Sequence, residues 1–365
     1  MKKRTLLFYC GLLLFVFAAA ALIYKEGSRR KAEAFDTMRE AAERYVRALE
    51  CVRNERLRRG IPISAEDTLG LGLIGLPNSS ISTSVGQLEA KRTAELPEMA
   101  ALCVRLFTEA GLKEGDTLAA CFSGSFPGLD LAVVCAADAM GLRIVYSAAV
   151  GASFYGANIP EYTAPEMLLT AYEAGLIGAA PALVTMGGQN DAGTDMTGAL
   201  MEETEEIEAV KARLAAEGLA VTPVASLEEA VSLRLGLYGK PDAFVNVGGN
   251  VAGIGRNAFA LENSYGILTP QRIELNAGSG LMEYYLNEGI PVISFLNIKK
   301  LCLEYGIGFD PDKIPAPGTE GVYYERRYDR GLIAAAAVLI FAALILIEKD
   351  RKKSLREEDI SGKDK

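Results

Sequence analysis

Two residue types are missing from this chain of 365 residues, which contains no histidine and no tryptophan. Without histidine there is no imidazole for a catalytic triad or dyad, for a zinc or haem ligand, or for a histidine pH switch. Basic charge is also scarce, since 38 Lys and Arg residues stand against 47 Asp and Glu residues and the net charge is −9. That balance argues against a general nucleic-acid binder, which needs a strongly basic face.

Half of the residues are apolar, which excludes disorder of the whole chain, and the length suggests one or two domains. Two apolar runs, residues 6–23 and 332–347, carry no charge over 18 and 16 residues. Each run is long enough as a helix to approach the thickness of a hydrocarbon core, about 30 Å. Both are therefore predicted to be transmembrane helices. A cleaved signal peptide stays open for the first run, and a buried core helix for the second.

The charges around the two runs predict the topology. Seven Lys and Arg residues follow residue 347, whereas only three arginines lie in the fifteen residues before the second run. Cytoplasmic flanks collect positive charge, so we expect the tail in the cytoplasm and, because there are two spans, the amino terminus as well. The first 31 residues carry +6 and the last 18 carry +1, which leaves −16 for the middle. This acidic middle is expected to face outward from the cell membrane.

A charged helical pattern over residues 32–59 ends at Gly60 and Pro62 and suggests a helix that continues out of the membrane. The expected order is a transmembrane helix at 1–24, a juxtamembrane stalk helix at 25–60, an extracytoplasmic α/β domain at 61–330, a second transmembrane helix at 331–347 and a charged cytoplasmic tail at 348–365.

Short apolar runs alternate with helical patterns through the predicted domain. The runs expected to be strands are 117–122, 143–149, 182–186, 220–224, 243–247 and 291–295. The stretches expected to be helices are 127–140, 164–175, 197–217, 226–236 and 279–288. Such alternation is typical of an α/β fold, here a doubly wound, mostly parallel sheet flanked by the two transmembrane helices.

Three polar, glycine-containing turns follow strands of this sheet, at residues 123–128, 187–193 and 248–255. Ligands of such sheets bind beyond the carboxyl ends of the strands, where turns expose backbone N–H groups. Because parallel strands end at the same edge, the three turns are expected to line a single cleft.

The first turn offers Ser123, Gly124 and Ser125 at the start of a helix, which suits a carboxylate or phosphate. It lacks the phosphate-loop, dinucleotide and nucleophile-elbow patterns. An ordinary tight turn is an equally open interpretation. Catalysis would use Ser123 or Ser125 as nucleophile, with Lys91 or a carboxylate in place of histidine as the base. Lys91 and Arg92 lie just before the alternating strands and helices of the domain and are candidates to meet an anionic ligand.

The other two turns offer backbone and amide groups to a ligand. Their candidate binding residues are Gly187, Gly188, Asn190, Asp191, Gly248, Gly249 and Asn250. The carboxylates of Asp191 and Asp195 are weak candidates for Mg²⁺ or Ca²⁺, which prefer oxygen ligands. A polar turn that caps the next helix, or glycines in left-handed turn positions, would explain the same residues without a ligand.

Several motifs together resemble one known family. They are LGLIGLPNSSISTSVGQLEAKRT, SGSFPGL, GASFYGANIPEYTAPEM and GGQNDAG. They resemble the poly-gamma-glutamate system protein family (PgsW), membrane-anchored proteins associated with bacterial capsule synthesis, over residues 70–295. The resemblance implies a pathway, poly-gamma-glutamate assembly or export at the cell surface. It implies no catalytic residue and no cofactor.

The sequence thus favours an accessory membrane protein whose surface domain binds the polymer or the membrane subunits of its synthase and exporter. One alternative is a histidine-independent hydrolase or transferase that acts on gamma-glutamyl bonds through Ser123 or Ser125. Another is a solute-binding sensor whose cleft takes a small amino acid. No cofactor is expected, and an acidic domain confines any polyanion to a small local site.

Overall fold

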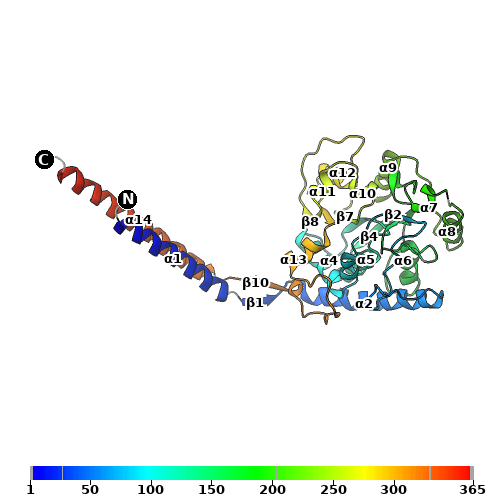
Figure 1. Ribbon diagram of the computed structural model, residues 1–365, viewed down its shortest axis with the longest axis horizontal. Helices are drawn as coiled ribbons and strands as arrows, with labels where there is room; N and C mark the ends of the chain where they lie inside the picture. The colour runs from blue at the N-terminus through cyan, green and yellow to red at the C-terminus, as the bar shows by residue number, and fades with distance from the viewer. Residues whose placement is uncertain (1–2, 27, 203, 329, 362–365) are drawn as a thin grey trace. The chain divides into compact units, whose positions relative to one another are not determined.

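The computed structural model describes residues 3–26, 28–202, 204–328 and 330–361, which divide into two compact units. One unit comprises the two ends of the chain, up to residue 32 and from residue 324. Its elements are α1 (Lys3–Glu26), β1 (Ser28–Lys31), β10 (Tyr324–Arg327) and α14 (Arg330–Ser361). Strand β1 pairs antiparallel with β10, and α1 contacts α14 (Figure 1).

Within the described residues, one helix is long and apolar enough to cross a membrane, the segment Arg330–Lys349 of α14. The first apolar run forms a shorter apolar helix, Tyr9–Lys25. By length and composition the structure therefore supports one candidate span where the sequence predicted two.

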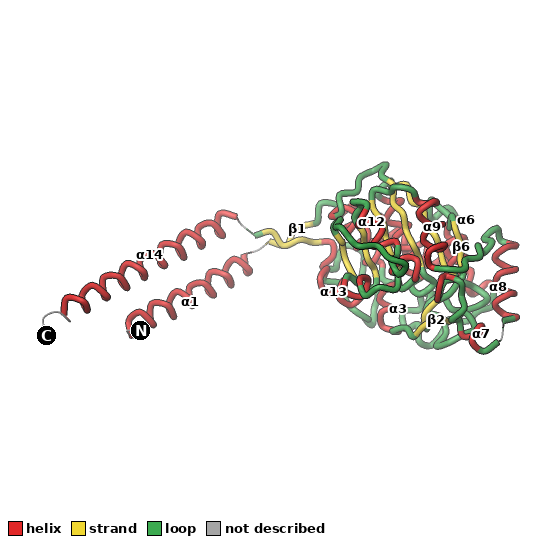
Figure 2. The backbone as a smooth tube through the Cα atoms, turned by 90° about the horizontal axis from the view of Figure 1, so that it is seen from above, coloured by secondary structure: helices red, strands yellow, loops and turns green. Residues whose placement is uncertain are grey.

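The second unit, residues 33–323, is built on a six-stranded sheet. Its strands are β3 (Thr117–Phe122), β4 (Arg143–Ala149), β6 (Leu183–Thr185), β7 (Ala243–Val247), β8 (Tyr265–Leu268) and β9 (Val292–Phe295). They lie in the order β6-β4-β3-β7-β9-β8, and all pairs are parallel except β8 with β9. Figure 2 shows the strands in yellow and the helices around them in red. The α/β fold with a mostly parallel sheet is confirmed.

Helices cover both faces of this sheet. Helices α5 (Pro127–Ala139) and α6 (Ala164–Glu173) contact each other and β4, and lie with α4 (Pro97–Glu109) below the strands in Figure 1. On the other face, α9 (Leu227–Tyr238) and α12 (Leu281–Asn287) pack against Ala119 and Cys121 of β3 and Phe244 of β7. Successive side chains of a strand point to opposite faces, so each strand contributes to both cores.

The helix predicted over residues 32–59 forms as α2 (Phe35–Arg58), but its interpretation as a stalk is wrong. One face of α2 is buried against α4 and α5. The Tyr45 hydroxyl donates to the Ala94 carbonyl oxygen at 3.0 Å, and the buried Arg56 guanidinium donates to the carbonyl oxygens of Gly72 and Ile74. The helical pattern therefore marks a core-packed helix of the domain.

Two further predictions are corrected. Residues 220–224 form no strand and make only an isolated bridge between Val184 and Val221. The helix expected at 197–217 is two helices, α7 (Thr197–Leu200) and α8 (Glu205–Ala216). The sequence also missed β8, a four-residue edge strand interrupted by Gly266 at φ +78°, because it is too short for a clear alternation.

The remaining elements near the carboxyl edge of the sheet are β2 (Ser82–Ser84), α3 (Leu88–Ala94), β5 (Ala152–Ser153), the short 3-10 helix Gln189–Asp191, α10 (Val251–Ile254), α11 (Phe259–Glu262) and α13 (Ile298–Tyr305). A second 3-10 helix, Gly321–Tyr323, contacts α4. Strands β2 and β5 form a separate parallel pair.

Candidate functional site

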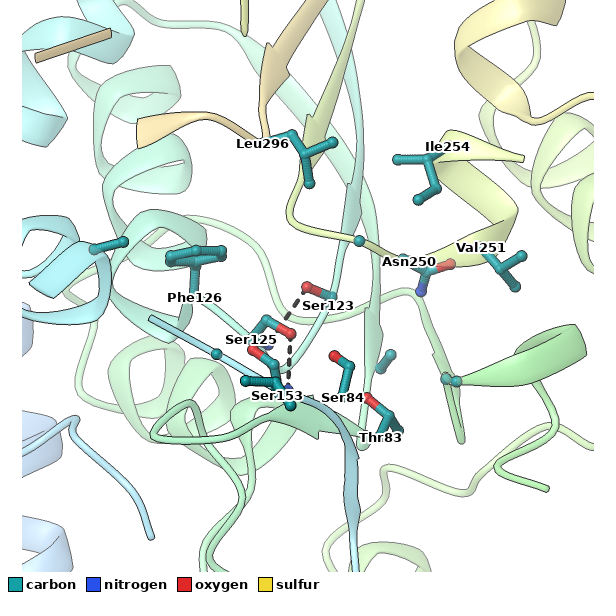
Figure 3. A pocket seen from close by; sticks show the side chains of 18 of the residues that line it. Thr83, Ser84, Ser123, Ser125, Phe126, Ser153, Asn250, Val251, Ile254 and Leu296 are labelled. Carbon is teal, nitrogen blue, oxygen red and sulfur yellow. Dashed lines mark hydrogen bonds between the residues drawn. The ribbon is translucent and has the colours of Figure 1, made fainter. Parts of the chain in front are cut away.

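A cavity of about 830 Å³ opens at the carboxyl edge of the sheet. The three predicted turns all contribute to it, through Ser123 and Ser125, through Gly187 and Gly188, and through Gly249 and Asn250. Figure 3 shows Ser123, Ser125 and Asn250 at the cavity. Strand β3 lies between β4 and β7. After β3 the chain forms β4 and β6 on one side of it, and then crosses to the other side to form β7, β8 and β9. Ligands of open α/β sheets bind in the crevice at such a switch point. The prediction that the three turns line one cleft is confirmed.

The first and third turns pack closely against each other beside the cavity. Gly248 has φ +72°, and a Cβ atom there would lie 2.3 Å from Ser123 Oγ. A side chain at this position would therefore clash and also strain the backbone. Gly248 thus allows close packing, and the neighbouring Gly249 is the residue that lines the cavity.

The sequence-predicted residues divide between the wall of the cavity and its surroundings. Those that line it are Lys91, Ser123, Ser125, Gly187, Gly188, Asp195, Gly249 and Asn250. Those that lie outside the lining are Arg92, Gly124, Asn190, Asp191 and Gly248.

Lys91 of α3 is 4% exposed and points to the first turn. Its ammonium nitrogen donates to the backbone carbonyl oxygen of Ser125 and, at 2.7 Å, to Ser153 Oγ. The Phe126 ring centroid lies 3.8 Å from the same nitrogen. Burial lowers the pKa of Lys91 from 10.5 to about 7, although the nearby Asp130 carboxylate opposes this shift. Lys91 is therefore a base that is available near neutral pH.

The hydroxyls of the two serines predicted as nucleophiles accept backbone hydrogen bonds. Ser125 Oγ accepts from the Ser153 N–H at 3.0 Å, and Ser123 Oγ accepts from the Ser125 N–H at 3.4 Å (Figure 3). The serine hydroxyl within hydrogen-bond distance of Lys91 Nζ is that of Ser153, which also lines the cavity.

Sequence reasoning missed Ser153. It follows β4 in the small-residue segment at 149–153, which carries no pattern typical of a nucleophile. It lies 62 residues from Lys91 along the chain, and only the pairing of β5 with β2 brings the two together.

Under the second turn lies a fully buried ion pair. Asp191 Oδ2 is 2.7 Å from Arg234 Nη1 of α9, and Asp191 Oδ1 accepts from Thr185 Oγ1 at 2.9 Å. Arg234 also donates to Ser147 Oγ at 2.9 Å and to Thr185 Oγ1 at 3.0 Å. Asp191 therefore fixes the glycine turn to the domain beneath it, and its carboxylate is not presented to the cavity as a metal ligand.

The other weak metal candidate, Asp195, lines the cavity but accepts the Gln189 N–H at 2.5 Å. Over the described ranges there is no group of three or more His, Cys, Asp or Glu residues that could hold a metal ion. Arg92 forms a bidentate pair with Asp310 at 2.6 Å, and the Asn190 amide oxygen accepts from Arg256. These two predicted binding residues are thus occupied by structural contacts.

Searches among known protein families, curated proteins and solved structures gave no match to this chain. The cavity is therefore interpreted from its own geometry and chemistry.

Proposed function

We propose that this protein belongs to poly-gamma-glutamate assembly or export, as its motifs resemble the family of that system, and that its cavity binds the polymer. The observation that supports binding is the convergence of three turns on one cavity of about 830 Å³. That volume is within the range of small-molecule sites, so it suits an end or a short segment of a chain.

The lining suits an anionic, amide-containing ligand. Hydroxyl groups of Thr83, Ser84 and Ser123 line the cavity together with the Lys299 side chain. Hydroxyls and an ammonium group are donors to carboxylate and amide oxygens. Residues 32–347 carry −16, so a local group of donors accounts for polyanion binding better than a broad surface does.

The proposal includes the finer features expected from the sequence. In it, a doubly wound domain lies outside the cell membrane, two transmembrane helices hold it there, and both termini are cytoplasmic. The membrane subunits of the polymer synthase and exporter are the proposed protein partners. The proposed anchors are the apolar helices Tyr9–Lys25 and Arg330–Lys349, and the seven Lys and Arg residues after residue 347 are the reason for proposing a cytoplasmic tail.

The binding proposal is tested with the full-length protein in detergent micelles and fluorescent poly-gamma-glutamate, by fluorescence anisotropy at low and high salt. Gly249 lines the cavity, is exposed, and has no atom within 4 Å of a Cβ atom built there, so Gly249→Phe introduces a bulky side chain at the cavity wall from an open position. Gly236 on α9 is equally open and lies outside the cavity, which makes Gly236→Phe the matched control. We expect binding that weakens with salt and is lost only in Gly249→Phe. Absence of binding at low salt, or equal loss in both variants, would refute the proposal.

A further inference from the structure

Two short strands place a serine and a lysine together at the wall of the cavity. Strand β5 pairs with β2, with Ser153 in register with Ser84, and α3 follows β2 with Lys91 on its buried side. The Oγ of Ser153 and the Nζ of Lys91 are 2.7 Å apart, which is within the range for proton transfer between a nucleophile and its base. Both residues line the cavity.

The chain passes unusually close to this pair at Gly86. A Cβ atom at Gly86 would lie 2.2 Å from the Phe154 carbonyl oxygen, 3.1 Å from Ser153 Oγ and 3.2 Å from Lys91 Cε. Only glycine therefore allows the backbone before α3 to cover the pair. This close cover keeps the lysine almost free of solvent while the serine still lines the cavity.

The Lys91 amine has three neighbours, which are the Ser125 carbonyl oxygen, Ser153 Oγ and the Phe126 ring. As an ammonium group it donates to both oxygens. As a neutral amine it has two N–H groups and one lone pair, and Ser153 is the neighbour whose hydroxyl can donate to that lone pair.

Asp130 of α5 is the acidic group whose charge favours the ammonium form of Lys91. Burial raises the pKa of the Asp130 carboxyl well above its ordinary value, which weakens that influence. The cavity lining also includes the charged side chains of Asp195 and Lys299.

We propose that Ser153 is the nucleophile and Lys91 the general base of an acyl-transfer site for amide bonds of a carboxylate-bearing chain. This inference rests on the proposed function, because the binding cavity supplies the substrate. Lys91 Nζ takes the proton of Ser153 Oγ, and Oγ attacks the carbonyl carbon of the amide. The C–N bond breaks, the leaving amine takes that proton from Lys91, and an ester to Ser153 remains. Water, or the amine of another chain, then attacks the ester and restores the Ser153 hydroxyl.

Ser125 is a positioning residue in this arrangement. Its hydroxyl accepts the Ser153 N–H at 3.0 Å, and its carbonyl oxygen accepts from Lys91. It therefore orients the backbone of the nucleophile and the amine of the base, and it transfers no proton itself.

The test measures two products on the full-length protein in detergent. One is the chain length of poly-gamma-glutamate with time; the other is covalent labelling by a fluorophosphonate, in which serine Oγ displaces fluoride from phosphorus, with the labelled residue identified by mass spectrometry. The variants are Ser153→Ala and Lys91→Arg, because an arginine side chain stays protonated and cannot act as the base. Exposed Ser232→Ala and Lys240→Arg are the matched controls.

We expect labelling at Ser153 whose rate rises with pH through about 7, and loss of labelling and cleavage by about 10²–10⁴-fold in both site variants. The controls should keep the wild-type rates. Binding without labelling or cleavage would overturn this inference and leave the proposed function intact, whereas absence of polymer binding would overturn the proposed function itself. Cleavage or labelling that persists in Ser153→Ala would also overturn the inference.

Discussion

Replacing Lys91 by methionine should stabilise the domain at pH 7 while it removes the proposed base. Folding moves the pKa of Lys91 from 10.5 to about 7. At pH 7 this shift lowers the free energy of unfolding by about 4 kcal/mol, compared with a group whose pKa is the same in both states. Methionine has nearly the same length and carries no such cost. It loses two hydrogen bonds of about 1 kcal/mol each and the contact with the Phe126 ring. The expected net gain is about 1–2 kcal/mol.

The dependence on pH gives this prediction a second readout. Between pH 7 and 10.5 the unfolded chain binds a proton at Lys91 that the folded protein does not bind, so wild-type stability rises with pH over that window. Lys91→Met lacks this contribution, and its advantage should shrink towards pH 10. Thermal unfolding of full-length protein in detergent, followed by circular dichroism, measures both effects. A gain of 1 kcal/mol corresponds to about 2–4 °C in Tm. Destabilisation at pH 7, or a difference that does not change with pH, would show that Lys91 is a structural residue.

Further substitutions test the packing and the buried charges of the domain. Gly86→Ala places a Cβ atom 2.2 Å from a backbone carbonyl oxygen and should lower the free energy of unfolding by about 1–3 kcal/mol. Gly236→Ala, at an open helix position, should raise it by up to about 1 kcal/mol. Both changes are measured as shifts in Tm. Arg234→Met leaves the Asp191 carboxylate buried without its charged partner, so the free energy of unfolding in urea should fall by about 3–5 kcal/mol. The double variant Asp191→Asn, Arg234→Met removes that charge as well and should lose less. A smaller loss in the single variant than in the double variant would contradict this reasoning. Burial raises the pKa of Glu98 to about 7. The protonated Glu98 carboxyl therefore contributes stability that is fully present below pH 4.5 and is lost as the pH rises through 7. In Glu98→Gln, Tm should depend less on pH between 4.5 and 7.

The α/β class and the common edge of the three turns could be predicted because both follow from local patterns. Apolar runs of strand length alternate with helical patterns, and parallel strands necessarily end at one edge of their sheet. The strand runs that failed were those at the margin of the sheet. Residues 220–224 are apolar enough for a strand but pair only through one bridge, and β8 is too short to show its period.

The role of the helix at residues 35–58 needed the tertiary structure. An amphipathic pattern specifies a helix with one apolar face, but it does not say which surface covers that face. Here the face packs on α4 and α5, and the Arg56 guanidinium is buried against carbonyl oxygens of the following loop. The same pattern in a free stalk would leave these groups exposed.

By itself, the sequence excluded histidine chemistry and named hydroxyls, carboxylates, Lys91 and Arg92 around three glycine turns as the candidates. Only the tertiary structure decided which serine meets Lys91 and which charged residues are already paired. Ser153 reaches Lys91 through a strand pairing between segments 62 residues apart, and Asp191 meets Arg234 through the packing of α9 under the sheet edge. Contacts of this kind depend on distance in space and on burial, and neither leaves a local pattern in the chain.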